Sequence, residues 1–140
     1  MSERQLGPSD VTLVRDAIHN PSEPRHFMQV VPAARRQVAT IGGAVVADSS
    51  DAVVVKEVGR GIYDPIVYFP RADVAEGVLA GIDRTTHCPL KGDTEYFDLV
   101  VGADRHAEAA WSYVTLVTDN PLQGLVAFDP AQVRVGVDGS

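Results

Sequence analysis

The strongest structural signal in the chain is the stretch RQVATIGGAVVA at residues 36–47. Apolar and polar residues alternate ahead of a pair of glycines, and an apolar run follows it, a pattern typical of two short strands. Gly42 and Gly43 supply the positive φ angles that a two-residue hairpin turn requires. We therefore predict a β-hairpin in which residues 36–41 pair with residues 44–47.

The rest of the chain from residue 25 onward also has the composition of a β protein. Short runs rich in Val, Ile, Phe and Tyr are separated by clusters of Gly, Pro, Asp and Ser, so we expect a strand in each run. Besides the hairpin, the expected strands cover residues 26–31, 52–58, 62–69, 94–101, 109–117, 125–128 and 133–137. This pattern of about eight short strands predicts a mainly β fold with short helices, built as a sandwich or a small partly open barrel.

Residues 1–24 differ from this pattern. Ser9 can cap a short helix that runs through His19, and prolines follow it. We therefore expect a helical N-terminal extension over residues 1–24 and a single β-rich domain over residues 25–140.

Two further segments interrupt the expected strands. Residues 73–80 place Val74, Val78 and Leu79 at helical spacing, which predicts a short helical turn. Residues 82–93, IDRTTHCPLKGD, are polar and include a proline and a glycine, which is typical of a loop. This expected loop is the densest functional candidate in the chain.

Composition limits the possible functions. The 140-residue chain has 12 Lys and Arg against 19 Asp and Glu, and its net charge of -7 disfavours a basic nucleic-acid binder. The single cysteine, Cys88, cannot form an internal disulfide, and with four scattered histidines it cannot build a Cys-rich zinc site, so no metal is predicted. No apolar segment reaches the roughly 20 residues of a membrane helix, and no secretory signal is visible. We expect a cytoplasmic protein that binds neither nucleic acid nor a membrane.

Five ordered blocks resemble a known family. They are GGAVVADS at 42–49, YFPRADV at 68–74, TTHCPLKG at 85–92, AWSY at 110–113 and VAF at 126–128. In this order they resemble the domain of unknown function 427 family, sometimes labelled nucleotidyltransferase-like, over about residues 25–137. The resemblance implies a small β-rich domain of barrel or β-tent type. The sequence departs from the family pattern at Leu90, where an aromatic residue is usual, and at Asp93 and Val114.

The TTHCPLKG block holds the candidate catalytic residues. Cys88 lies between His87 and Lys91, and two potential cations beside a thiol favour the nucleophilic thiolate. We therefore predict His87, Cys88 and Lys91 as catalytic candidates, with Cys88 as nucleophile or proton donor and Lys91 stabilising negative charge. The alternative is that Cys88 is buried and inert.

Residues of neighbouring blocks could bind a ligand beside this cysteine. Lys91 and Arg71 could hold an anionic group such as a phosphate or a carboxylate, and aromatic side chains could line the pocket. The candidate ligand-binding residues are Tyr68, Arg71, Asp73, Thr86, Trp111 and Tyr113. The alternatives are a surface ion pair of Lys91 with Asp93 or Asp73, and a core role for the aromatic side chains.

These residues predict a small-molecule-binding β domain with a pocket for a small anionic or polar ligand. The pocket could belong to an enzyme that depends on Cys88 and Lys91, or to a non-catalytic module that senses the ligand. A protein-interaction module with an acidic surface is the third possibility. Nucleotidyl transfer is disfavoured, because the sequence has no Asp-x-Asp pair to hold magnesium and no glycine-rich loop before Lys91. The sequence indicates no particular cofactor.

Overall fold

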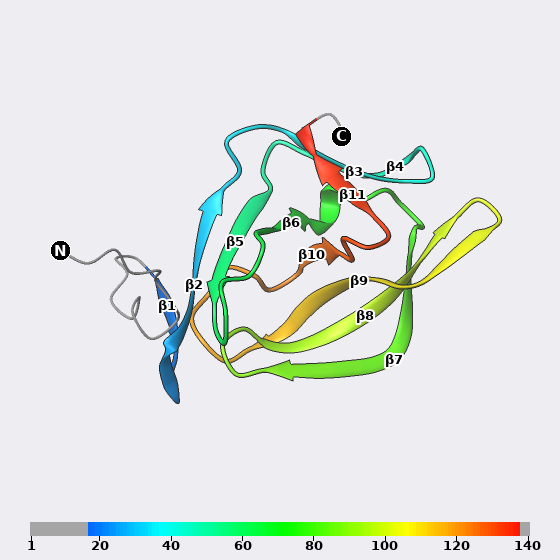
Figure 1. Cartoon of the computed structure of the whole chain (residues 1–140). Helices are drawn as coiled ribbons and strands as arrows, with labels where there is room; N and C mark the ends of the chain where they lie inside the picture. Colours follow the sequence, from blue (N-terminus) through cyan, green and yellow to red (C-terminus); the bar gives the residue numbers. More distant parts are fainter. Residues whose placement is uncertain (1–16, 138–140) are drawn as a thin grey trace.

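The computed structural model describes residues 17–137, in which eleven strands form two antiparallel sheets (Figure 1). The strands are β1 Ile18–Asn20, β2 Glu23–Pro32, β3 Gln37–Ile41, β4 Ala44–Ser49, β5 Val53–Val58, β6 Ile66–Pro70, β7 Leu79–Cys88, β8 Gly92–Val101, β9 Asp104–Leu116, β10 Leu125–Phe128 and β11 Arg134–Gly136. Between the strands lies a 3-10 turn, Arg71–Asp73. The prediction of a mainly β domain is therefore confirmed, while the short helices reduce to this turn.

The larger sheet has eight strands in the order β1-β2-β5-β6-β10-β9-β8-β7, and the smaller sheet has three in the order β11-β3-β4. Figure 1 shows that the larger sheet bends, with β2 and β5 on one side, β7, β8 and β9 on another, and β6 and β10 between them. Within residues 17–137 its outer strands, β1 and β7, are not paired with each other, so the sheet does not close into a barrel. The bend brings the turn between β7 and β8 toward β2 and β5.

The hairpin predicted from residues 36–47 is confirmed. β3 and β4 pair antiparallel, and the turn residues Gly42 and Gly43 have φ angles of 55° and 83°. Two positive φ angles in succession define the type of turn whose twist matches that of the flanking strands. A side chain other than glycine would be strained at either position.

The start of the domain differs from the expectation. Ile18–Asn20 is strand β1, and Ile18 pairs with Met28 of β2, so the end of the expected helix is extended. The remainder of that helix, from Ser9 to Asp16, lies outside the described residues. Because β2 begins at Glu23, the β-rich domain starts before residue 25.

Two other local predictions were wrong. Residues 73–80 contain no helical turn beyond Arg71–Asp73, because Val74 bridges to Ala47 of β4 and β7 already starts at Leu79. Residues 82–93 are not a loop but the arms and tip of a hairpin, in which β7 pairs with β8. The polar side chains of residues 83–87 are explained by exposure, since β7 is an outer strand of its sheet.

Alternate residues of β6 and β10 divide the buried side chains into two clusters. Phe69 and Val126 belong to a cluster shared by both sheets. Tyr68 and Ala127 belong to a second cluster on the opposite face of these strands. The second cluster also holds Met28, Val55, Leu90, Tyr113 and Leu122. The polar side chains of the candidate site, described next, pack against this second cluster.

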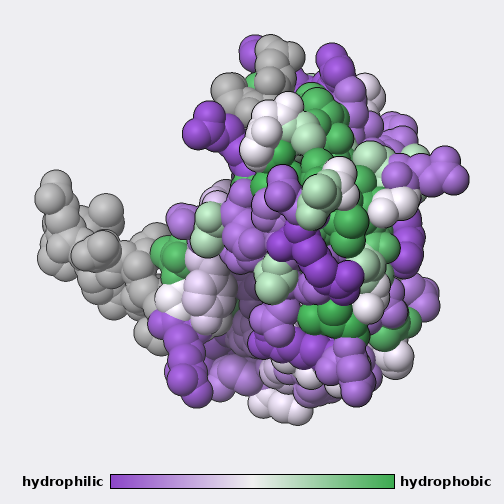
Figure 2. All heavy atoms as spheres, turned by 90° about the vertical axis from the view of Figure 1, so that its right-hand side faces the viewer, coloured by the Kyte–Doolittle hydropathy of each residue, from purple (hydrophilic) through white to green (hydrophobic). Residues whose placement is uncertain are grey.

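The face on the right-hand side of Figure 1 mixes polar and apolar side chains without one dominating it (Figure 2). Hydrophobic residues gather in patches in both the upper and the lower part of this view, and hydrophilic residues lie between them. Within residues 17–137, no helix is long and apolar enough to cross a membrane.

Candidate functional site

The turn between β7 and β8 has a backbone that only glycine can adopt at one position. Gly92 has a φ of 130°, and a Cβ placed there would collide with the backbone carbonyl of Thr115 in β9. Leu90 is fully buried, and its carbonyl accepts a hydrogen bond of 2.7 Å from the Thr118 hydroxyl. The Asn120 amide donates to the carbonyl of Lys91 at 3.3 Å. The tip of the hairpin is therefore fixed against the body of the protein, and the Lys91 side chain is directed inward.

Lys91 is a buried cation, with 7% of the residue exposed. Its ammonium group forms an ion pair with the Glu57 carboxylate of β5 and lies 6.0 Å from the centre of the Tyr113 ring. Burial alone would lower the pKa of Lys91, but the nearby Tyr68 oxygen and Glu57 carboxylate outweigh it and raise that pKa. Lys91 is therefore charged at neutral pH and acts as a hydrogen-bond donor rather than as a base.

Glu57 joins Lys91 to a histidine. Its second oxygen accepts a 2.8 Å hydrogen bond from Nε2 of His26 in β2. Burial would raise the pKa of Glu57, but Lys91 and His26 outweigh it and hold that pKa below its usual range. Glu57 is therefore a carboxylate with a partner for each oxygen.

The tautomer of His26 follows from its two neighbours. The Asn20 side-chain oxygen accepts the Ser22 backbone N–H at 2.9 Å, which leaves the Asn20 NH2 group facing Nδ1 of His26 at 3.2 Å. Since Nδ1 accepts this hydrogen bond, the imidazole proton lies on Nε2 and points at Glu57. A chain of hydrogen bonds thus runs from Asn20 through His26 and Glu57 to Lys91.

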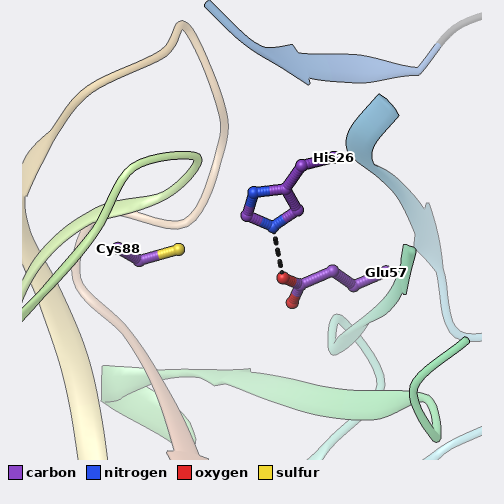
Figure 3. Close-up of side chains that lie close together, drawn as sticks. All are labelled: His26, Glu57 and Cys88. Atoms are coloured by element: carbon purple, nitrogen blue, oxygen red, sulfur yellow. Dashed lines mark hydrogen bonds and ion pairs between the residues drawn. The ribbon is translucent and has the colours of Figure 1, made fainter. Parts of the chain in front are cut away.

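Cys88 lies beside this chain. Its half-buried thiol accepts a hydrogen bond of 3.4 Å from the Lys91 backbone N–H. One side-chain donor atom from each of His26, Glu57 and Cys88 lies within 4.8 Å of the others. Figure 3 shows the three side chains pointing toward one another from different strands. We call these three residues the His–Glu–Cys cluster. Nitrogen, oxygen and sulfur donors placed together in this way can bind a transition metal.

A first cavity, the tyrosine cavity, lies on the Lys91 side of this cluster and has a volume of about 450 Å³. Its wall residues are Glu57, Ile66, Tyr68, Arg84, Lys91, Tyr96, Glu108, Trp111, Tyr113 and Asp129. The Trp111 indole N–H donates to the Tyr68 hydroxyl at 3.3 Å, and the Tyr68 and Tyr113 ring centres are 6.3 Å apart. Burial raises the pKa of Tyr68 and of Tyr113, so both hydroxyls keep their protons at neutral pH.

A second cavity, the histidine cavity, has a volume of about 630 Å³. Its wall residues are Asn20, Glu23, Arg25, His26, Gly59, Arg60, Tyr63 and Pro89. His26 lines this cavity, whereas its partner Glu57 lines the tyrosine cavity. The His26–Glu57 hydrogen bond therefore forms part of the partition between the two cavities.

Four of the residues predicted from sequence meet at one place. Tyr68, Lys91, Trp111 and Tyr113 all line the tyrosine cavity, and the Cys88 thiol accepts a hydrogen bond from the Lys91 backbone N–H. Tyr68 and Tyr113 are also buried. These two rings therefore belong to the core and line the cavity at the same time.

Arg71 and Asp73 lie away from this cavity. Arg71 is exposed, 3.5 Å from the Glu95 carboxylate and above the Phe97 ring. Asp73 accepts a 2.6 Å hydrogen bond from the Ser49 hydroxyl. Asp73 therefore joins the 3-10 turn to β4 of the smaller sheet, whereas Arg71 contacts β8 of the larger sheet.

Thr86 and His87 also point elsewhere. The Thr86 hydroxyl bonds Thr94 and lies 3.0 Å from the Tyr96 hydroxyl, so it reaches the tyrosine cavity only through Tyr96. His87 is exposed, and its Nδ1 lies 2.7 Å from Asp93. Neighbouring residues of a strand face opposite sides, so the histidine beside Cys88 is His26 rather than His87.

Sequence reasoning missed the two groups that complete the site, His26 and Glu57. Asp93, the expected partner of Lys91, pairs with His87 instead, and Lys91 pairs with Glu57. No spacing signal links Glu57 to Lys91, because β5 and the β7–β8 turn meet only through the bend of the larger sheet. The same bend brings His26 to the site.

The fold and the site define a class: a small antiparallel β domain that encloses a buried Lys–Glu ion pair and a cysteine between two cavities. Residues 29–139 match the model of the family described as a domain of unknown function, DUF427, and the chain belongs to that family. No curated protein matches the chain.

Proposed function

We propose that the protein binds a small polar molecule in the tyrosine cavity. The observation that supports this is the convergence of the Lys91 ammonium, the Tyr68 and Tyr113 hydroxyls and the Trp111 ring on one cavity. Aromatic walls with a few polar edges are typical of small-ligand sites. The same cavity would serve an enzyme or a sensing module.

The charges of the wall favour a neutral polar ligand over an anion. Lys91 is already neutralised by Glu57, and Arg84 lies 2.6 Å from Glu108. Asp129 adds another carboxylate. An anion would therefore meet no unpaired positive charge in this wall, whereas hydroxyl or amide groups could bond the phenols.

The protein carries its own reporter for this proposal, because Trp111 is the one tryptophan in the chain and lines the cavity. Native mass spectrometry of protein purified from its own host identifies a retained molecule, and titration of that molecule is followed by Trp111 emission. Tyr113→Phe should weaken binding by about tenfold, the scale of one lost hydrogen bond. Tyr63→Phe is the matched control, since Tyr63 lines the histidine cavity. Equal affinities of the two variants would contradict the proposal.

A second candidate function is catalysis that depends on Cys88 and Lys91. It is favoured by the His26–Glu57 pair beside the thiol, because a histidine oriented by a carboxylate is a common partner of nucleophilic cysteine. In this role Nδ1 of His26 would exchange Asn20 for Cys88 and accept the thiol proton. Labelling of folded protein with iodoacetamide tests it: Cys88 should react at a rate lowered by His26→Gln. A thiol that is labelled only after unfolding would instead be structural.

We also propose that the bent larger sheet and the smaller sheet together form the partly open, β-tent-like arrangement implied by the family resemblance. The bend seen in Figure 1 supports it.

A further inference from the structure

We propose that the His–Glu–Cys cluster binds one divalent transition metal, with zinc as the first candidate. His26 comes from β2, Glu57 from β5 and Cys88 from the end of β7, and Figure 3 shows their side chains converging. Imidazole, carboxylate and thiolate are the three ligand types that zinc takes in proteins. The proposal does not rest on the molecule that fills the tyrosine cavity.

The separation of the donor atoms fits a metal-free site. Zinc bonds of about 2.0 to 2.3 Å place the ligand atoms of a tetrahedral site roughly 3.3 to 3.8 Å apart. The three donor atoms here lie within 4.8 Å of one another. His26 Nε2 and the Glu57 oxygen are 2.8 Å apart and need to separate by about 0.5 Å, whereas the Cys88 sulfur needs to approach them by about 1 Å. Rotation of the half-buried Cys88 side chain can supply a movement of this size.

Each oxygen of the Glu57 carboxylate already has a hydrogen-bond donor. Lys91 occupies one carboxylate oxygen, and the other receives the Nε2 proton of His26. A metal takes the place of that proton between nitrogen and oxygen, and gains the sulfur as its third ligand. For the protons to balance, Cys88 releases its thiol proton to solvent and the imidazole proton moves from Nε2 to Nδ1.

This proton movement makes Asn20 a test residue. Asn20 now donates to Nδ1, so after metal binding its amide has to turn over and present its oxygen to the new Nδ1 proton. Asn20→Asp places a carboxylate there instead. A carboxylate behind a coordinated histidine raises the basicity of the ligand and tightens metal binding.

The position of the cluster leaves room for a fourth ligand. His26 and Pro89, the residue that follows Cys88, both line the histidine cavity of about 630 Å³. Three protein ligands and one open position are the arrangement of catalytic rather than structural zinc sites. The open position would hold water or a small molecule entering through this cavity. When the metal is bound, Cys88 is a ligand and not a nucleophile.

The experiment is a titration of the metal-free protein with Co²⁺, followed by its displacement with Zn²⁺. We expect one Co²⁺ per chain, with a thiolate-to-cobalt charge-transfer band and the visible bands of a tetrahedral site. Cys88→Ser should remove the charge-transfer band, and His26→Gln should lower the affinity at least tenfold. Asn20→Asp should raise the affinity by about tenfold. Thermal melting of each variant without metal establishes that it is folded.

His106→Gln, a change in β9 away from the cluster, is the matched histidine control and should leave the titration unchanged. Absence of binding, or binding that Cys88→Ser does not alter, would overturn the proposal. Loss of binding in His87→Gln instead would place the metal on the exposed His87–Asp93 pair, and this would overturn it as well. An unchanged or weaker affinity of Asn20→Asp would contradict coordination through Nε2.

Discussion

Replacement of Lys91 by methionine tests the buried ion pair directly. Methionine keeps most of the side-chain volume and removes the charge, so Glu57 remains as a carboxylate that has lost one of its two partners. Breaking a buried pair by removal of one partner costs about 3 to 5 kcal/mol. Because Glu57 keeps His26 and 16% of its side chain is exposed, we expect a loss of about 2 to 3 kcal/mol in the free energy of unfolding.

Urea unfolding at neutral pH measures this loss. For a chain of this length it corresponds to a fall in melting temperature of about 6 to 10 °C. The double variant with Lys91→Met and Glu57→Gln should recover much of the lost free energy of unfolding, since no unpaired charge is left. The deficit of Lys91→Met should also shrink as the pH falls, because the pKa of Glu57 rises without Lys91 and a protonated Glu57 needs no cation.

A solvated loop lysine, as residues 82–93 suggest from sequence alone, would behave differently. Its replacement would change the free energy of unfolding by less than about 0.5 kcal/mol. That result for Lys91→Met, or a double variant no more stable than the single one, would refute the reasoning from the buried pair.

Two further predictions concern stability. Gly92→Ala should lower the free energy of unfolding in urea by at least about 3 kcal/mol, because strain at its positive φ adds to a collision with the backbone of β9. Gly102 has a φ of 60° and open space around it, so Gly102→Ala should cost only about 1 kcal/mol. Similar losses for the two variants would contradict this reasoning. Asp98 accepts hydrogen bonds from the Glu108 backbone N–H and from Arg105, which hold its pKa below the usual range. The stability that it contributes is complete above about pH 4 and is lost as the pH falls through its lowered pKa, so Asp98→Asn should flatten the acid side of the stability profile measured by thermal melting. An unchanged acid slope would argue against this role.

The parts of the fold that were predictable from sequence are those that local chemistry determines. Gly42 and Gly43 dictate their turn, and the apolar runs on either side dictate its strands. The strand over residues 79–88 carries no such signal, because most of its side chains are exposed and polar. An outer strand of this composition has the sequence pattern of a loop.

The candidate site was predictable only where its residues share a motif. Lys91 and Cys88 lie in one block, and Tyr68, Trp111 and Tyr113 were placed beside them through the order of the blocks. His26 and Glu57 could not be found in this way. They meet Cys88 because of the strand order and the bend of the larger sheet. The local alternation of polar and apolar residues predicts neither of these properties.

The pairing of β2 with β5 also decides which charge enters the site. Glu57 lies opposite Met28, and its neighbour Lys56 lies opposite Gln29. A slip of one residue in this pairing would turn Glu57 outward and place Lys56 beside Lys91, so two ammonium groups would face each other where an ion pair now stands. In a chain with this wrong register, Lys56 and Lys91 would repel each other at the place where Glu57 and Lys91 attract in the correct one. The ion pair of the site therefore also favours the correct pairing of β2 with β5.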